Sequence, residues 1–88
     1  MVKASKRFEN DLSKLPDYLR DKAILWIELL ETLGMREIRK RSGFHDEALK
    51  GKRRGERSVR LSRSYRLIYN ELDGGREILL LEITKHEY

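Results

Sequence analysis

A nearly continuous apolar run near the C-terminus, residues 78–83 (ILLLEI), restricts the possible folds more than any other stretch. A strand of this kind needs cover on both of its faces, so it belongs inside a sheet. Residues 59–61 and 65–69 also indicate strands, because apolar and polar side chains alternate there or branched and aromatic residues dominate. Residues 73–75 (DGG) supply the turn before the last strand. The second half of the chain therefore predicts a three-stranded antiparallel meander.

The first half of the chain carries two helical patterns that are joined by a proline. Apolar residues form one stripe over residues 5–15, and Pro16 ends this helix because proline lacks the amide hydrogen. A second helix is predicted from about residue 17 to residue 33, with Gly34 as its terminating residue. Residues 2–4 allow a brief edge strand.

The predicted fold class is α+β, with an N-terminal helical hairpin packed on a small antiparallel β-sheet of three to four strands. At 88 residues, the chain is the length of one small domain, so residues 1–88 are expected to form a single domain.

Positive charge is concentrated in one segment. Eight cations and one acid lie between Lys50 and Arg66, in a chain whose net charge is +5. Clustered charge of this sign indicates a polyanionic partner, either nucleic acid or an acidic protein. The alternative is a solvated basic face that serves only solubility, and charge alone favours neither interpretation.

The composition excludes several kinds of protein. No cysteine is present, so disulfides and thiolate metal sites are not expected. No apolar run approaches the roughly 18 residues of a membrane span, and no signal peptide is recognisable. We therefore expect a cytoplasmic protein without a membrane segment.

Metal and cofactor chemistry is also not expected. His45, Asp46 and Glu47 are three metal-ligand types in succession, but neighbouring residues do not point to one place in either a helix or a strand. The sequence has no Gly-rich phosphate loop and no nucleophile elbow.

Strand alternation divides the cations of the basic segment into two sets. If Val59 and Leu61 face the core, Arg60 faces outward, and Arg66 lies on the same open face. Residues 50–56 form a loop or strand entry that would serve as a docking surface. The RNA-binding residues expected from the segment are Lys50, Lys52, Arg53, Arg54, Arg57, Arg60 and Arg63.

A mid-strand arginine is costly unless an anion meets it. For Arg66 the alternative to a bound phosphate is an ion pair with Glu82 or Glu77 of the next strand.

Several of these side chains could together cleave RNA without a metal. The internal 2′-hydroxyl is then the nucleophile, and the protein supplies a base, cations for the phosphoryl oxygens and an acid for the leaving oxygen. Glu47, His86 and Arg66, the last with Lys50 and Arg60, match these roles in type and number. Taken singly, Glu47 could instead be an ordinary surface glutamate, and His86 could be an exposed tail residue.

The second half of the chain contains, in order, the segments EALKG, RSVRL and YRLIY, a hairpin, an apolar strand and a final KHEY. This pattern resembles the RelE/ParE superfamily of toxins from bacterial toxin–antitoxin systems. The pattern is most similar to YoeB- and RelE-type messenger-RNA interferases. It covers residues 47–88, whereas the helical half agrees only in the order of its elements.

This resemblance implies a ribosome-dependent endoribonuclease that cuts translated messenger RNA. Glu47 would be the general base, Arg66 the main stabiliser of the transition state and His86 the general acid. Tyr88 would stack on or orient the substrate base. The implied partners are a cognate antitoxin protein, the ribosome and messenger RNA, with no cofactor.

The sequence departs from the YoeB-type pattern in three respects, one of which is a first strand that is short or absent. Ala48 stands where a proline is common, and Glu87 separates His86 from Tyr88. Two other functions therefore stay open: a ParE-like toxin that inhibits DNA gyrase without catalysis, and a non-catalytic module that binds RNA.

Overall fold

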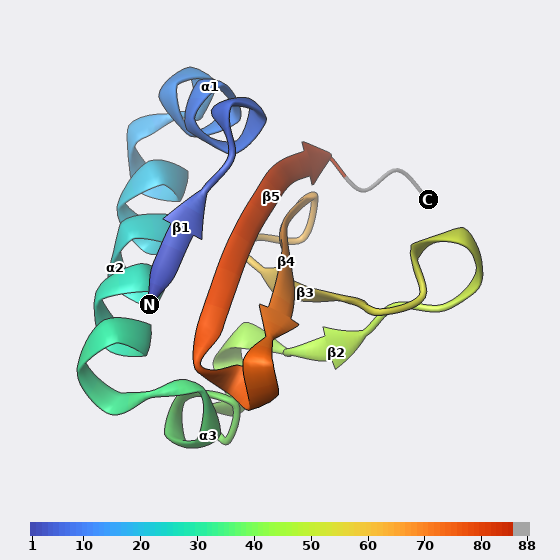
Figure 1. Ribbon diagram of the computed structural model, residues 1–88. Helices are drawn as coiled ribbons and strands as arrows, with labels where there is room; N and C mark the ends of the chain where they lie inside the picture. The colour runs from blue at the N-terminus through green and yellow to red at the C-terminus, as the bar shows by residue number, and fades with distance from the viewer. Residues whose placement is uncertain (86–88) are drawn as a thin grey trace.

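The computed structural model describes residues 1–85, without the side chain of Ser42, and it confirms the α+β fold (Figure 1). Three helices and five strands alternate with three short 3₁₀ turns. Their bounds are β1 (Val2–Ala4), α1 (Lys6–Lys14), α2 (Asp17–Leu33), α3 (Met35–Ile38), η1 (Ser42–Phe44), β2 (Glu47–Ala48), η2 (Gly51–Arg53), β3 (Glu56–Arg60), β4 (Tyr65–Leu72), η3 (Asp73–Gly75) and β5 (Glu77–Lys85).

The two long helices begin and end where the sequence predicts. The Ser5 Oγ caps α1 by accepting a hydrogen bond of 3.0 Å from the amide of Phe8. Pro16 then separates α1 from α2. The α2 helix ends at Gly34, whose φ of 85° lies in the region that glycine adopts most easily.

The sheet is mixed and has five strands in the order β1-β5-β4-β3-β2. The predicted meander is present as β3, β4 and β5, which are antiparallel neighbours. The brief N-terminal strand is also present, as β1, and it runs parallel to β5. The fifth strand, β2, exceeds the predicted three to four, because its two residues are too few to show a period in the sequence.

The core lies between one face of the sheet and the helices, which Figure 1 shows together on one side of the sheet. Trp26 of α2 packs on Tyr69 of β4 with 5.3 Å between ring centroids. The other face of the sheet, called the open face below, has no helix over it among the described residues. The largest fully buried side chains are Trp26, Tyr69, Phe8, Leu19, Ile38, Leu61, Leu67, Leu80 and Val59.

The apolar run in β5 contains a bulge. Ile68 of β4 is opposite Glu82, whereas Tyr69 is opposite Leu80, so Leu81 has no opposite residue in β4. The bulge shifts the alternation by one residue, and both Leu80 and Ile83 are therefore buried in the core.

Helix α1 covers the edge of β5 beyond the end of β1. The backbone amide of Ser5 donates to the carbonyl of Leu80 at 2.9 Å, and the Ser5 hydroxyl donates to the carbonyl of Leu81 at 2.7 Å. A carboxylate oxygen of Asp11 accepts a hydrogen bond of 3.1 Å from the amide of Ile83. The side chains of α1 thus occupy edge positions where another strand would otherwise bind.

Candidate active site

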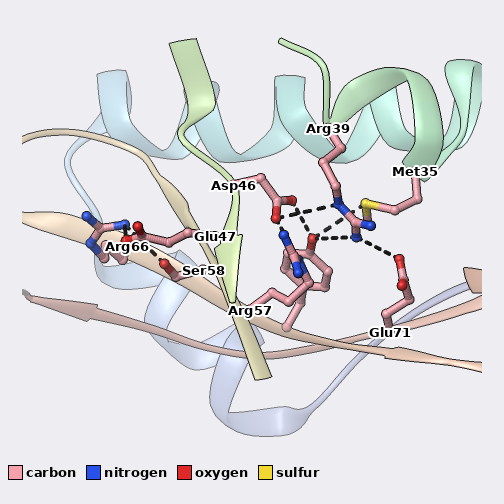
Figure 2. Close-up of polar contacts among 9 residues, drawn as sticks. Met35, Arg39, Asp46, Glu47, Arg57, Ser58, Arg66 and Glu71 are labelled. Carbon is pink, nitrogen blue, oxygen red and sulfur yellow. Dashed lines mark hydrogen bonds and ion pairs between the residues drawn. The ribbon is translucent and has the colours of Figure 1, made fainter. Parts of the chain in front are cut away.

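Three strands bring Glu47, Ser58 and Arg66 together on the open face. The Nη1 atom of Arg66 lies 3.1 Å from Oε1 of Glu47 and donates a hydrogen bond of 3.0 Å to Oγ of Ser58. Figure 2 shows this group apart from a second polar cluster. The Arg66 side chain is 11% exposed and that of Glu47 is 57% exposed, so the guanidinium is held while the carboxylate is accessible to solvent.

The sheet register explains why these residues meet. Glu47 is opposite Ser58 in the β2–β3 pair, and Ser58 is opposite Ile68 in the β3–β4 pair. Arg66 is two residues before Ile68, so it lies on the same face and is diagonal to Ser58. The predicted proximity of Glu47 and Arg66 is therefore present in the structure.

Two arginines lie directly opposite each other on this face. Arg60 of β3 is the register partner of Arg66 of β4. Like charges in this position repel, and Glu47 offsets one of them. An anion bound between Arg60 and Arg66 would reduce the repulsion between the two guanidinium groups. A phosphodiester, which carries one negative charge, is an anion of this kind.

The expected alternative, an ion pair of Arg66 with Glu82 or Glu77, is wrong in the described part of the chain, because Arg66 pairs with Glu47. Glu82 instead contacts Arg53 at 3.3 Å and Arg7 at 3.7 Å. The carboxylate that pairs with Arg66 is that of Glu47 in β2, a strand that the sequence pattern did not predict.

Residues 50–56, called the basic loop below, present three exposed cations, Lys50, Lys52 and Arg54. Arg53 of the same loop turns back toward the sheet, where its Nε lies 2.7 Å from Glu56 and its Nη1 lies 3.3 Å from Glu82. Burial alone would lower the pKa of Arg53, but the contacts with these two carboxylates raise it, so the group stays charged. Two ion pairs thus hold the loop against the sheet.

The turn after β3 adds Arg63, which is exposed. Arg57, in contrast, lies on the helical side of the sheet, because it is one residue away from Ser58 in β3. Its Nε donates a hydrogen bond of 2.7 Å to Asp46. The structure therefore separates Arg57 from Arg60 and Arg66.

A second polar cluster surrounds Asp46 on the helical side of the sheet (Figure 2). The Asp46 side chain is only 2% exposed, and it accepts hydrogen bonds from Arg57 and from the hydroxyl of Tyr69. The Nε atom of Arg39 lies 3.7 Å from Asp46, and the Nη2 atom of Arg39 donates to Glu71 at 2.7 Å. This cluster, called the Asp46 cluster below, consists of Arg39, Asp46, Arg57, Tyr69 and Glu71.

Neighbouring groups fix the protonation states of Tyr69 and Arg39 in the Asp46 cluster. Burial, together with the hydrogen bond to Asp46, raises the pKa of the Tyr69 hydroxyl, so this group stays a neutral donor. Burial alone would lower the pKa of Arg39, but contacts with Tyr69, Glu71 and Asp46 raise it. The cluster is thus two arginines and two carboxylates around one hydroxyl.

Sequence reasoning did not find the Asp46 cluster. One signal was present: Tyr69 is three residues after Arg66, so strand alternation places it on the opposite, core-facing side, where a tyrosine hydroxyl needs a partner. Asp46 precedes Glu47, and adjacent residues of an extended chain point to opposite faces, so one faces the helices when the other faces the open side.

The described part of the chain offers no arrangement of His, Asp and Glu side chains that could hold a metal ion. Asp46 and Glu47 point in different directions in Figure 2. Within residues 1–85, no helix combines the length and the hydropathy that a bilayer span requires.

His86 and Tyr88, two of the predicted catalytic residues, lie outside the described residues. The last described strand, β5, places Thr84 opposite Arg66 and Lys85 opposite Tyr65. Glu47 and Arg66 are therefore the two predicted catalytic residues whose positions the structure gives.

The described residues form a small α+β fold whose sheet has one basic open face. The sequence model for the ParE toxin of the type II toxin–antitoxin system parDE matches residues 2–87, and the chain belongs to this family. A comparison with curated proteins found no match.

Solved structures of related toxins have the same fold. The chain is similar to YafQ from E. coli strain BL21(DE3), with 16% identity and a TM-score of 0.77 over 97% of this chain and 91% of that one. It is similar to the YoeB/ParE toxin from Agrobacterium tumefaciens, with 16% identity and a TM-score of 0.75 over 98% of both chains. A third similar structure is the archaeal RelE–RelB complex from Pyrococcus horikoshii OT3, with 25% identity and a TM-score of 0.73 over 96% of this chain and 91% of that chain.

Proposed function

We propose that this toxin is an endoribonuclease that cleaves messenger RNA on the translating ribosome, with the 2′-hydroxyl of the RNA as nucleophile. The observation that carries the proposal is the contact of 3.1 Å between Glu47 and Arg66 on the open face, with Arg60 directly opposite Arg66. A carboxylate and two guanidinium groups at one place match a base and a phosphate-binding site.

The proposed reaction needs no metal and balances in one displacement. Glu47 takes the proton of the 2′-hydroxyl, and the oxygen attacks the adjacent phosphorus. The bond from phosphorus to the 5′-oxygen breaks as the new bond forms, and the leaving oxygen receives a proton. Arg66 and Arg60 stabilise the negative charge that develops on the phosphoryl oxygens. The products are a 2′,3′-cyclic phosphate and a 5′-hydroxyl.

The remaining catalytic roles are assigned by resemblance. We assign the proton donor to His86 and the orientation of the substrate base to Tyr88. Both residues follow β5, which places Thr84 opposite Arg66. Histidine suits the donor role because its ordinary pKa is near neutral.

The basic loop and the turn after β3 would bind RNA phosphates outside the reaction centre. Lys50, Lys52, Arg54 and Arg63 are exposed and are available for such contacts. Arg53 and Arg57 carry ion pairs in the structure, so any contact of theirs with RNA would compete with Glu82 or Asp46.

The proposed partners are the ribosome with its messenger RNA and a cognate antitoxin, and the proposed location is the cytoplasm. Solved complexes of similar toxins, RelE with RelB and YoeB with YefM, support the antitoxin. Exposed apolar side chains on α2, including Tyr18 at 69% and Leu25 at 50%, suit an amphipathic partner segment.

Mapping of RNA 5′ ends in a reconstituted translation reaction tests the proposal. We expect new ends within messenger RNA on ribosomes and little cleavage of free RNA, because a small site with one base benefits from a substrate that the ribosome positions. The Glu47→Gln variant is expected to form far fewer ends, since it keeps the shape of the side chain and loses the base.

The family match favours a second candidate function, a non-catalytic toxin that inhibits DNA gyrase. A gyrase supercoiling assay with the same preparation separates the two. Loss of supercoiling with no new RNA ends would support the gyrase inhibitor. Ribosome binding without either effect would indicate a module that only binds RNA.

A further inference from the structure

We propose that Asp46 is a positioning residue that fixes the catalytic carboxylate of Glu47 from the opposite side of the sheet. The inference rests on the proposed function only in so far as Glu47 is the base. Its structural part, that the Asp46 cluster holds β2 in place, stands independently.

The β2 strand has little else to hold it. It has two residues, lies at the edge of the sheet and pairs only with β3 among the described strands. Glu47 and Ala48 are both exposed. Beyond the strand, the amide of Leu49 donates to the carbonyl of Glu56 at 2.9 Å. Pairing through two residues gives the strand little stability by itself. Contacts outside the strand are therefore needed to fix the position of Glu47.

Asp46 provides that anchor immediately before the strand. Its buried carboxylate contacts Arg57 of β3 at 2.7 Å and also accepts from Tyr69 of β4. Tyr69 packs in turn against Trp26 of α2, so the anchor is tied to the core. Since the backbone of Asp46 is held in this way, the next residue along the chain has a defined position.

The side chains of Asp46 and Glu47 differ in length, and each reaches its partners on its own face of the sheet. The short Asp46 side chain meets donors that lie close beneath it, whereas the longer Glu47 side chain crosses to Arg66. A shift of β2 by one residue would exchange the faces of the two carboxylates. The contacts of the Asp46 carboxylate with Arg57 and Tyr69 therefore favour the register in which Glu47 faces Arg66.

The backbone before the anchor is unusual as well. His45 has a φ of 46°, which a non-glycine residue adopts only at some cost. This conformation turns the chain from η1 into β2 and directs Asp46 toward the helices. The contacts of Asp46 offset this cost.

Amide hydrogen exchange of the Tyr69→Phe variant tests the structural part without any RNA. The variant keeps the ring on Trp26 and removes the hydroxyl that donates to Asp46. We expect exchange at Leu49 to become about tenfold faster because β2 opens locally. The amide of Leu61, which donates to the carbonyl of Tyr65 at 2.9 Å beyond the other end of β3, serves as the internal control: its acceleration reports the overall loss of stability and should be smaller than that at Leu49. Equal acceleration at both amides, or none at Leu49, would overturn the proposal.

Single-turnover cleavage on programmed ribosomes tests the catalytic part. A displaced base slows the reaction, and we expect Tyr69→Phe to lower the rate constant about 10- to 100-fold with little change in ribosome affinity. Ser13→Ala is the control: it removes a hydroxyl from an exposed residue of α1 that contacts the carbonyl of Asn10 at 2.7 Å, and it should leave the rate unchanged.

A double-mutant cycle separates positioning from general loss of structure. In a Glu47→Gln background the base is already absent, so Tyr69→Phe should have no further effect on the residual rate. Additive losses would show that the Asp46 cluster does not act through Glu47. If the wild-type protein does not cleave RNA, the proposed function fails, while the exchange rates at Leu49 still decide whether the cluster holds β2.

Discussion

The Nη1 atom of Arg66 contacts both a carboxylate and a hydroxyl. Its contacts with Glu47 and Ser58 hold it on the open face while 11% of its side chain stays exposed. In the proposed mechanism, a bound phosphodiester would share this guanidinium with Glu47, so the base would lie near the 2′-hydroxyl that it deprotonates. The proposed mechanism thus links binding of the phosphate and removal of the proton.

Replacing Arg66 tests its role directly. We expect Arg66→Ala to lower ribosome-dependent cleavage by about 10²- to 10³-fold, because a donor to the developing charge is lost. The fold should persist, as judged by circular dichroism. Arg76→Ala, a change of equal charge at an exposed residue after η3, is the control. Unchanged toxicity of Arg66→Ala at matched expression would remove Arg66 from the mechanism.

Because of Tyr69, the free energy of unfolding is expected to decrease at alkaline pH. The pKa of this hydroxyl is raised above its ordinary value of 10.0 by burial and by Asp46. Below pH 10 both the folded and the unfolded chain keep the proton, so the contribution is complete. Above pH 10 the unfolded chain releases the proton first, and the free energy of unfolding falls by up to about 1.4 kcal/mol per pH unit.

The Tyr69→Phe variant isolates this effect. At pH 7 the variant should be less stable by roughly 1–3 kcal/mol, because Asp46 and Arg39 lose a partner. The difference from wild type should shrink between pH 10 and pH 11, since only the wild type carries the titrating group. Urea unfolding at each pH measures it, and a constant difference would show that Tyr69 titrates normally.

At the scale of single elements, α1 acts as an edge cover for β5. Ser5 contributes twice, as the cap that accepts from Phe8 and as a donor to the carbonyl of Leu81. The helix therefore links the start of the fold to the end of the last strand.

Two serine substitutions, one at the N-cap of α1 and one inside the helix, separate this role from helix propensity. We expect Ser5→Ala to cost roughly 1–2 kcal/mol, since it removes a cap and leaves a carbonyl without its donor. Ser13→Ala removes only a local contact of 2.7 Å with Asn10 and should change stability by less than about 0.5 kcal/mol. Urea unfolding midpoints compare the two, and equal effects would contradict the edge-cover role.

Long helices and strands are easier to predict from the sequence than short ones, because only a long element shows a periodic pattern. The helices at residues 6–14 and 17–33 are long enough to show apolar stripes and clear ends, and the structure matches them closely. The β2 strand has two residues, so no period exists to detect. The bulge at Leu81 is also hidden, because a run of leucines looks the same in either register.

At the scale of the whole molecule, the sheet separates two groups of charged side chains. The helical side holds the Asp46 cluster, and the open face holds Arg60, Arg66 and the basic loop. Alternation along β3 predicted the outward direction of Arg60. The partners of Arg57 and Arg53 depend on residues far away in the sequence, Asp46 and Glu82, so they follow only from the folded structure.

Paired substitutions test this separation. Arg57→Ala leaves the buried Asp46 carboxylate without its nearest cation and should cost roughly 3 kcal/mol of stability. Lys52→Ala removes an exposed loop cation, so we expect unchanged stability and weaker, less salt-dependent binding to ribosomes. Thermal unfolding and ribosome co-sedimentation measure the two effects, and a stable Arg57→Ala variant would contradict the assignment.

The most direct test of the account is cleavage of a messenger RNA that carries one 2′-deoxynucleotide at the cut position. We expect ribosome-bound RNA with the natural sugar to yield a 2′,3′-cyclic phosphate and a 5′-hydroxyl, and the 2′-deoxy substrate to stay intact at that position. Cleavage of the 2′-deoxy substrate at the same bond would contradict attack by the 2′-hydroxyl and the role of Glu47 as its base.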